Sequence, residues 1–109
     1  MNTPFPTRRL RRLRSSQTLR DMLAEVTLST NDLVAPLFVC QGEDVAREIP
    51  SMPGQFQFSV DRALATVERW RDKGIRAVLL FGLPASKDDV GSAAWADGEV
   101  VQELCRQIK

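Results

Sequence analysis

The sequence contains no histidine and only two cysteines among its 109 residues. The absence of histidine removes the commonest general base near neutral pH and the commonest metal ligand. Cys40 and Cys105 lie far apart in the chain, and neither belongs to a Cys-x-x-Cys pair or a metal-binding cluster. We therefore expect reduced thiols in a cytoplasmic protein, with both side chains buried in structural positions rather than acting as nucleophiles or ligands.

Long apolar runs are also lacking. No stretch approaches the roughly 20 residues that a membrane-spanning helix requires, and the charged amino terminus is not followed by the apolar segment of a secretory signal. The Arg- and Ser-rich leader shares some features with an organelle transit peptide, but the helix predicted after it favours a structural role. We expect no membrane partner.

Acidic residues are absent from the first 20 positions, which carry six arginines and a formal charge of +6. The remaining 89 residues carry nine basic and fourteen acidic residues, a formal charge of −5. A basic leader on a mildly acidic body indicates attraction either to a polyanion or to another copy of the same body. In these first 20 residues Leu10 and Leu13 interrupt the arginines, and Phe5 is the only aromatic residue. This pattern disfavours nucleic-acid binding.

What is present is an alternation of helix and strand signals. Residues 1–14 have no core-forming period and predict an extended arm, after which Ser15 or Ser16 caps a helix. We assign residues 1–31 to this arm and first helix, with a role in oligomerisation. The apolar stripe predicted for the helix consists of Leu19, Met22, Leu23 and Val26.

Two strands are predicted from apolar runs at 36–40 and 75–82. Pro36 cannot donate to a ladder and belongs near a strand's start or on a free edge. The second strand is apolar almost throughout, which is typical of a parallel strand covered on both faces.

Two further helices are predicted. The first, capped by Ser59 and ending at Lys73 with Gly74 after it, carries Trp70 on its packing stripe. The second covers 97–108 and carries Cys105 on its apolar stripe.

Long loops at 41–58, with a short extended piece at "QFQF", and at 83–96 follow the two strands. The site of a parallel α/β fold lies on such strand-to-helix loops. Because two parallel strands do not make a stable sheet, we expect a third strand directly after Lys109.

Five segments together cover nearly all of residues 7–109: "RRLRRLRSSQTLRDML", "NDLVAPLFVCQG", "REIPSMPGQFQFSVD", "GIRAVLLFGLP" and "KDDVGSAAWADGEVVQ". In these segments and in their order, the chain resembles the amino-terminal part of the porphobilinogen synthase family, also called 5-aminolevulinate dehydratase. The ordered combination of "IPSMPG", "AVLLFG" and "KDDVGSAA" is the most specific part of the resemblance.

The resemblance implies an amino-terminal arm and the first two β/α units of a (β/α)8 TIM barrel, with residues 32–109 as the start of a barrel that is incomplete in this chain. It implies a lyase that condenses two 5-aminolevulinate molecules to porphobilinogen with loss of water, in haem (porphyrin) biosynthesis. It also implies zinc or magnesium in the complete enzyme, and a homo-octamer or hexamer built through arm contacts between subunits.

The resemblance carries over no catalytic and no metal-binding residue. Neither Schiff-base lysine motif of the family is present, nor is its cysteine cluster, and we expect the 109 residues alone to be inactive. The residues that do carry over belong to the oligomer arm (Arg8, Arg9, Leu10, Arg11, Arg12, Leu13 and Arg14) and to loops at the barrel mouth or a subunit interface (Ser51, Met52, Pro53, Gly54, Lys87, Asp88, Gly91 and Ser92).

Simpler explanations compete for some of these residues. Lys87 is more consistent with a solvated loop than with a Schiff-base lysine, because the adjacent Asp88 and Asp89 stabilise its charged form. Trp95 is a candidate lid or interface residue. Two alternative functions stay open: a truncated module that docks on full-length subunits, and a small α/β domain whose basic arm binds nucleic acid.

Overall fold

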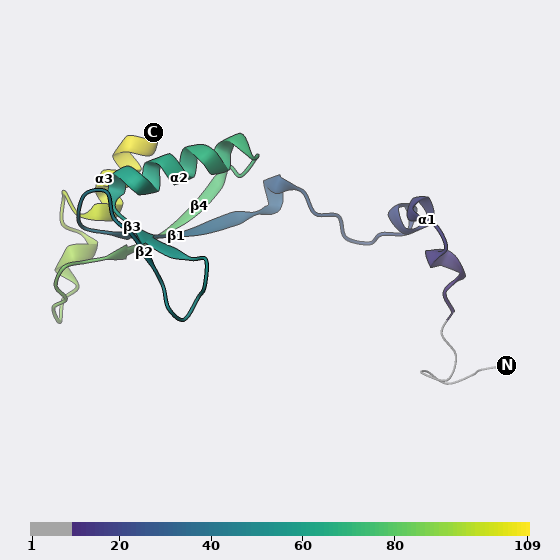
Figure 1. Ribbon diagram of the computed structural model, residues 1–109, viewed down its shortest axis with the longest axis horizontal. Helices are drawn as coiled ribbons and strands as arrows, with labels where there is room; N and C mark the ends of the chain where they lie inside the picture. The colour runs from purple at the N-terminus through teal and green to yellow at the C-terminus, as the bar shows by residue number, and fades with distance from the viewer. Residues whose placement is uncertain (1–9) are drawn as a thin grey trace.

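The computed structural model describes residues 10–109, which form an α/β body preceded by a projecting arm (Figure 1). The arm contains a 3-10 turn, Arg12–Arg14, and helix α1, Gln17–Met22. A further 3-10 turn, Thr30–Asp32, precedes the body. The prediction of a fully extended arm up to residue 14 is therefore wrong at the first turn, where the Arg14 amide donates to the carbonyl of Arg11 at 2.9 Å.

Helix α1 is shorter than its sequence pattern predicted. Ser16 caps it as expected, since its hydroxyl accepts the Leu19 amide at 3.2 Å. The helix ends at Met22, however, and Val26 lies outside it. Met22 and Val26 are 76% and 78% exposed, because the arm does not fold back on the body (Figure 1). A helix of six residues has few internal hydrogen bonds, and no packing surface of the body is present to stabilise further helical turns.

The body is built on a four-stranded sheet in the order β2-β3-β1-β4. Strands β1 (Val34–Cys40) and β4 (Ala77–Leu83) pair in parallel along their whole length. Strands β2 (Ala46–Glu48) and β3 (Phe56–Phe58) form an antiparallel hairpin, and β3 pairs with β1 in parallel. Strand β3 confirms the short extended piece predicted at "QFQF". Strand β2 was not predicted, because a strand of three residues is too short to produce a clear period within the 41–58 loop.

Strand β1 begins two residues earlier than predicted, so that Pro36 lies within it. Pro36 stands opposite Leu79 of β4, whereas β3 pairs with β1 only from Phe38. The proline therefore lies where one side of β1 has no partner strand. This is the free-edge position that its missing N–H requires.

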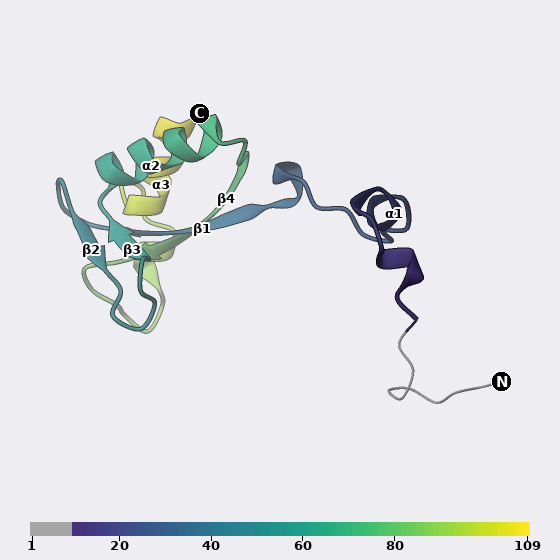
Figure 2. The ribbon, with the colours of Figure 1, turned by 45° about the vertical axis from the view of Figure 1, so that its right-hand side comes forward.

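Helices α2 (Val60–Asp72) and α3 (Val100–Ile108) cover one face of the sheet (Figure 2). The buried core between them and the strands consists of Leu37, Val39, Ala63, Val100 and Leu104, with Trp70 packed against it as predicted. On the other face, Phe38 and Phe81 stack with ring centroids 5.3 Å apart. That face is not covered, since Phe81 is 45% exposed, and the expectation of two covered faces is not met in residues 10–109.

The ends of the two long helices follow different rules. Helix α2 stops at a Schellman motif, as its Lys-Gly ending predicted: the Ile75 amide donates to the Trp70 carbonyl at 3.0 Å, and Gly74 has a φ of +92°. Helix α3 begins at Val100, three residues later than predicted.

Cys40 is buried as expected, but Cys105 is exposed, so its predicted core position is wrong.

Candidate functional site

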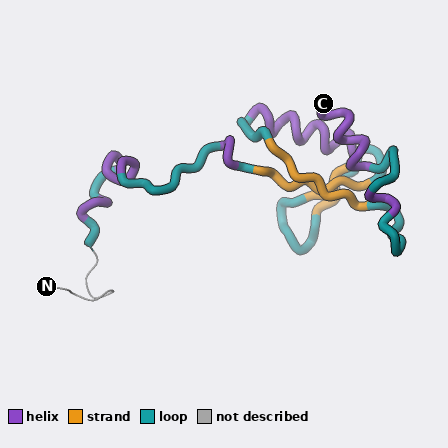
Figure 3. The backbone as a smooth tube through the Cα atoms, turned by 180° about the vertical axis from the view of Figure 1, so that it is seen from behind, coloured by secondary structure: helices purple, strands orange, loops and turns teal. Residues whose placement is uncertain are grey.

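The carboxyl ends of β1 and β4 lie at one edge of the sheet, because the two strands are parallel. The loop 84–99, which connects β4 to α3, lies at the end of the body opposite to the arm (Figure 3). In open or closed parallel sheets this edge carries the site, since strand-to-helix loops gather there. We therefore expect the candidate site on this loop.

A pocket of about 390 Å³ lies beside the loop. Four predicted site residues line it together: Lys87, Asp88, Gly91 and Ser92. The strand β4 and helix α3 contribute Gly82 and Gln102 to its wall, along with apolar side chains. The structure thus brings four of the six "KDDVGS" residues into one concave site at the carboxyl end of a strand.

Asp88 organises the loop around this pocket. Its carboxylate accepts the Ser92 amide at 2.9 Å and also the Ser92 hydroxyl. The chain turns between them at Gly91, whose φ of +62° lies in the left-handed region that favours glycine. The hydrogen bond from the Ser92 hydroxyl is the main cause that lowers the pKa of Asp88 below its usual value. Asp88 is therefore an ionised anchor of the turn at neutral pH.

Lys87 precedes this anchor and is exposed. Within residues 10–109 its ammonium takes part in no ion pair within 4.0 Å. An exposed, solvated amine lacks the desolvation that activates a nucleophilic lysine. The geometry is consistent with binding an anionic group at the pocket rim and gives no reason to assign a Schiff base to this residue.

Gly82 and Gln102 are pocket residues that the sequence analysis did not select. A Cβ atom on Gly82 would lie 2.7 Å from Cγ2 of Val101, so the glycine permits α3 to approach β4. A glycine inside an apolar strand is a recognised sign of close backbone approach, and this signal was available in the sequence. The side-chain amide of Gln102 donates a hydrogen bond to the Ala94 carbonyl at 2.8 Å. No local sequence pattern predicts this contact.

The second predicted loop, Ser51–Gly54, lies elsewhere. It forms the tip of the β2–β3 hairpin, where the Gly54 amide donates to Oε1 of Glu48 at 2.9 Å. Because β3 runs parallel to β1, the residues that precede β3 lie toward the amino end of the sheet. The loop is therefore separate from the pocket that Lys87 lines, and its role at the barrel mouth or in a subunit interface stays a prediction.

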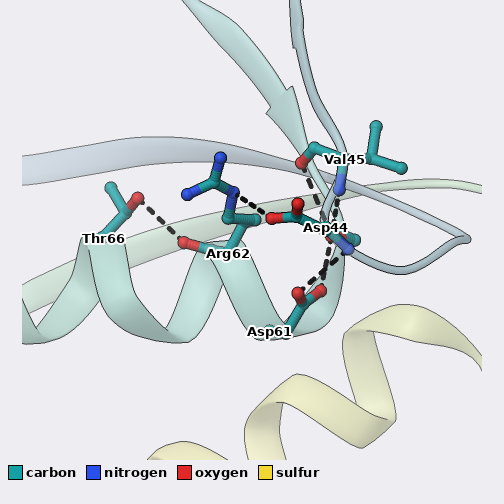
Figure 4. Close-up of polar contacts among 6 residues, drawn as sticks. Asp44, Val45, Asp61, Arg62 and Thr66 are labelled. Carbon is teal, nitrogen blue, oxygen red and sulfur yellow. Dashed lines mark hydrogen bonds and ion pairs between the residues drawn. The ribbon is translucent and has the colours of Figure 1, made fainter.

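A polar junction joins the loop after β1 to the start of α2 (Figure 4). Ser59 occupies the N-cap position but makes no capping hydrogen bond, contrary to the prediction. Its buried hydroxyl accepts the Val45 amide at 2.9 Å and donates to Asp61. Asp61 also accepts the Asp44 amide at 3.0 Å, and the Ser59 hydroxyl is the main cause that lowers the pKa of Asp61. The junction holds the residues that lead into β2 against the start of α2.

The predicted oligomer arm is only partly within the described residues, since Arg8 and Arg9 lie outside them. Leu10 and Leu13 are 83% and 60% exposed. The remaining arginines of the run, Arg11, Arg12 and Arg14, are also exposed. These side chains are exposed among the described residues, and an exposed apolar and cationic arm is typical of a segment that binds another molecule.

Potential metal ligands do not cluster in the part of the chain that the structure describes. No three residues among its Cys, Asp and Glu side chains are arranged to hold an ion. None of the described helices is both long enough and apolar enough to cross a membrane.

Comparisons with known proteins agree over almost the whole chain. The family model described as "Delta-aminolevulinic acid dehydratase" matches residues 7–109. Two relatives of that name, from Synechococcus elongatus and Methanothermobacter thermautotrophicus, are 46% and 44% identical to this chain over 96% and 99% of its length. These matches cover only 32% and 34% of the relatives, so the chain spans about a third of their length.

A solved structure gives the same agreement in three dimensions. The crystal structure of delta-aminolevulinic acid dehydratase (porphobilinogen synthase) from Toxoplasma gondii, in complex with the reaction product porphobilinogen, superimposes with a TM-score of 0.78 at 29% identity. It matches 94% of this chain and 29% of that chain.

Proposed function

The chain belongs to the delta-aminolevulinic acid dehydratase family, as its motifs predicted, and on this premise we propose that it is the amino-terminal segment of a porphobilinogen synthase. The reaction of the complete enzyme is the condensation of two 5-aminolevulinate molecules to porphobilinogen with loss of water. The observation that carries the proposal is the match of residues 7–109 to the family, with the "KDDVGS" residues lining a pocket at the carboxyl end of β4.

In this proposal residues 32–109 are the start of a TIM barrel and residues 1–31 are its oligomerisation arm. The exposed apolar face that carries Phe38 and Phe81 supports the barrel, because inward-facing side chains of such barrels pack against other strands. The edge of β4 is where the next strand of the barrel joins. The cytoplasm is the proposed location, in line with two free thiols.

The proposal assigns neither the catalytic lysines nor a metal to this segment. Residues 10–109 contain no group of three Cys, Asp or Glu side chains that could hold an ion, and we assign none of them to the zinc or magnesium of the complete enzyme. Lys87, Asp88, Gly91 and Ser92 form part of the wall of the substrate region instead. These residues shape the pocket, and Lys87 places its ammonium group near the carboxylates of the substrate.

The partner proposed for the arm is another subunit of the same enzyme, in a homo-octamer or hexamer. Leu10 and Leu13 supply apolar contact while the arginines pair with carboxylates of the acidic body. Replacing both leucines by serine is expected to shift the assembled enzyme toward smaller species in sedimentation velocity. An unchanged oligomer would contradict this role.

A chimera tests the enzymatic proposal. Residues 1–109 replace the matching third of the Synechococcus elongatus relative, and porphobilinogen formation from 5-aminolevulinate is measured beside the unmodified relative. We expect activity from the chimera and none above blank from the 109-residue chain alone. A chimera that is folded and assembled yet inactive would refute the proposal. Turnover by the 109-residue chain alone would refute the prediction that it contains no catalytic residue.

The two alternative functions are not favoured. The ordered match to an enzyme family makes a nucleic-acid-binding α/β domain a poor description of this chain. A separate module that docks on full-length subunits has no observation of its own, because the same arm contacts occur within the proposed enzyme.

A further inference from the structure

Residues 88–96, within the loop after β4, fold into a compact unit that we call the loop unit. The carboxylate of Asp88 accepts the Ser92 amide at 2.9 Å. The carbonyl of Gly91 accepts the Ala94 amide, also at 2.9 Å. Each of these hydrogen bonds joins residues that are only three or four positions apart, so the loop unit holds its shape through local contacts.

One hydrogen bond joins the loop unit to the rest of residues 10–109. Nε2 of Gln102, in the first turn of α3, donates to the Ala94 carbonyl at 2.8 Å. Apolar packing adds little, since Val90 and Trp95 of the loop unit are 74% and 71% exposed. The pocket lies between the loop unit and this first turn of α3, so Gln102 makes the contact that sets the separation of its two walls.

The segments on either side of the loop unit leave it room to move. Gly98 follows it with a φ of +89°, and no atom lies within 4 Å of the position that a Cβ would take there. Ala85, Ser86 and Lys87 precede it and are exposed. The whole loop lies at the end of the body opposite to the arm (Figure 3). A rotation about these two segments would widen the pocket without breaking a hydrogen bond inside the loop unit.

The side-chain amide of Gln102 is satisfied on one side only. A carbonyl accepts and does not donate, so Ala94 requires Nε2 and turns Oε1 away from itself. Oε1 is buried and accepts no hydrogen bond from the part of the chain that the structure describes. A buried acceptor without a donor costs free energy of the same order as a hydrogen bond contributes. The closed position of the loop unit thus gains one hydrogen bond and buries one unpaired oxygen, two effects that offset each other.

We propose that Gln102 is a positioning residue that holds the loop unit as a releasable lid on the pocket. The inference rests on the proposed function, in which this pocket belongs to the substrate region. Because the closed and open positions differ little in free energy, both are populated, and a ligand that fills the closed pocket shifts the balance toward closure. Gln102 touches no reacting atom and acts on how tightly the pocket closes.

Fluorescence tests the lid in the 109-residue chain. Cys105 of α3 is exposed and Cys40 is buried, so a dansyl group can be attached to Cys105 alone. Energy transfer from Trp95, taken as the difference from a Trp95→Phe chain, then reports the position of the loop unit. Gln102→Glu is expected to lose most of this transfer at neutral pH, because a carboxylate cannot donate to the Ala94 carbonyl and is unfavourable when buried beside it.

The same variant has a recovery test. Acidification to about pH 4 is expected to restore the transfer in Gln102→Glu, because a protonated carboxyl donates through its O–H. Lys87, Asp88 and Glu99 line the same pocket in both chains, so the unmodified chain at each pH is the reference. Gln107→Glu is the matched control, since Gln107 donates to Glu103 at 2.7 Å on the same helix outside the pocket, and it should leave the transfer unchanged.

Kinetics of the chimera test the effect on binding. Gln102→Glu is expected to raise the KM for 5-aminolevulinate by roughly tenfold with kcat within about twofold, because an open lid weakens binding of the substrate and the transition state equally. Gln102→Met removes the hydrogen bond and the buried oxygen together, so its KM should stay within about threefold of the unmodified value.

Several results would overturn the proposal. They are equal transfer in Gln102→Glu and Gln107→Glu, no recovery of transfer on acidification, a fall in kcat with KM unchanged, or a Gln102→Met variant as impaired as Gln102→Glu. The fluorescence measurements do not depend on activity. An inactive chimera therefore refutes the enzymatic proposal and leaves the lid to be decided by energy transfer, so the two failures are distinguishable.

Discussion

Removal of the Ser59 hydroxyl is the sharpest perturbation of the polar junction. Ser59 is fully buried, with 0% exposure, and its hydroxyl accepts the Val45 amide at 2.9 Å. In Ser59→Ala this amide loses its partner in a half-buried position. Loss of one such hydrogen bond, with its donor left unsatisfied, costs about 1–2 kcal/mol in the free energy of unfolding. We therefore expect Ser59→Ala to loosen the attachment of the β2–β3 hairpin to α2.

The assay is urea unfolding of the chain followed by circular dichroism. With a slope of about 1 kcal/mol per molar urea for a chain of this size, the midpoint should fall by about 1–2 M. Thr66→Val is the matched control on the same helix. Thr66 is also buried, at 5% exposure, but its hydroxyl donates only to the Arg62 carbonyl one turn earlier, and its removal should change the midpoint little.

The same variant has a predicted pH dependence. The hydroxyl of Ser59 lowers the pKa of Asp61 in the folded chain. A lowered pKa contributes stability above the ordinary carboxyl range, and this contribution is lost as the pH falls through the lowered pKa. The deficit of Ser59→Ala should therefore be larger at about pH 7 than at about pH 3. Equal midpoints for Ser59→Ala and Thr66→Val, or a deficit that grows on acidification, would refute this account of the junction.

Three further predictions concern the core and the pocket. Leu104→Ala, at a fully buried position, should lower the free energy of unfolding in urea by about 2–5 kcal/mol, whereas Leu28→Ala on the arm should lower it by under about 0.5 kcal/mol. Similar losses for the two variants would show that Leu104 does not belong to the core. Gly82→Ala should cost about 1–3 kcal/mol because its Cβ meets Val101, and Val101→Ala in the same chain should restore part of it; a neutral Gly82→Ala would disprove the close approach. Asp88→Asn should speed amide hydrogen exchange in the 88–92 turn near neutral pH, and unchanged protection would show that the carboxylate does not hold the loop.

The resemblance to the family came from the sequence alone and proved correct, because ordered motifs such as "IPSMPG" and "AVLLFG" do not depend on knowing the fold. The end of helix α2 was also predictable to within one residue, since the helix ends at Asp72 with Lys73 as its C-cap. Its apolar stripe and its Lys-Gly ending are local signals, and the Schellman hydrogen bonds of Gly74 and Ile75 follow from them. Helix α1 was not predictable in the same way, since a stripe that predicts burial does not reveal whether the surface that buries it belongs to the same chain.

The candidate site also has a part that was predictable from the sequence and a part that was not. The "KDDVGS" loop was recognised from its motif, and its place at the carboxyl end of β4 follows from the order of helices and strands. The placement of Ser51–Gly54 at the other end did not follow, because it depends on β2, whose three residues form a strand only through pairing with β3. Gln102 was missed because it meets Ala94 only after α3 has packed. Gly82 carried a signal in the sequence as a glycine inside an apolar strand, but Val101, the residue that it approaches, is distant along the chain.

The sequence by itself determined the family, the α/β alternation, the uneven charge, the absence of histidine and the ends of the elements that carry local stop signals. These properties depend on residue identity and on spacings within one or two turns. Only the tertiary structure decided which face of the sheet is covered, that β2 pairs with β3, and that Ser59 joins the residues before β2 to α2 instead of capping the helix. These properties depend on contacts between segments far apart in the chain, and no local pattern of residues specifies such contacts.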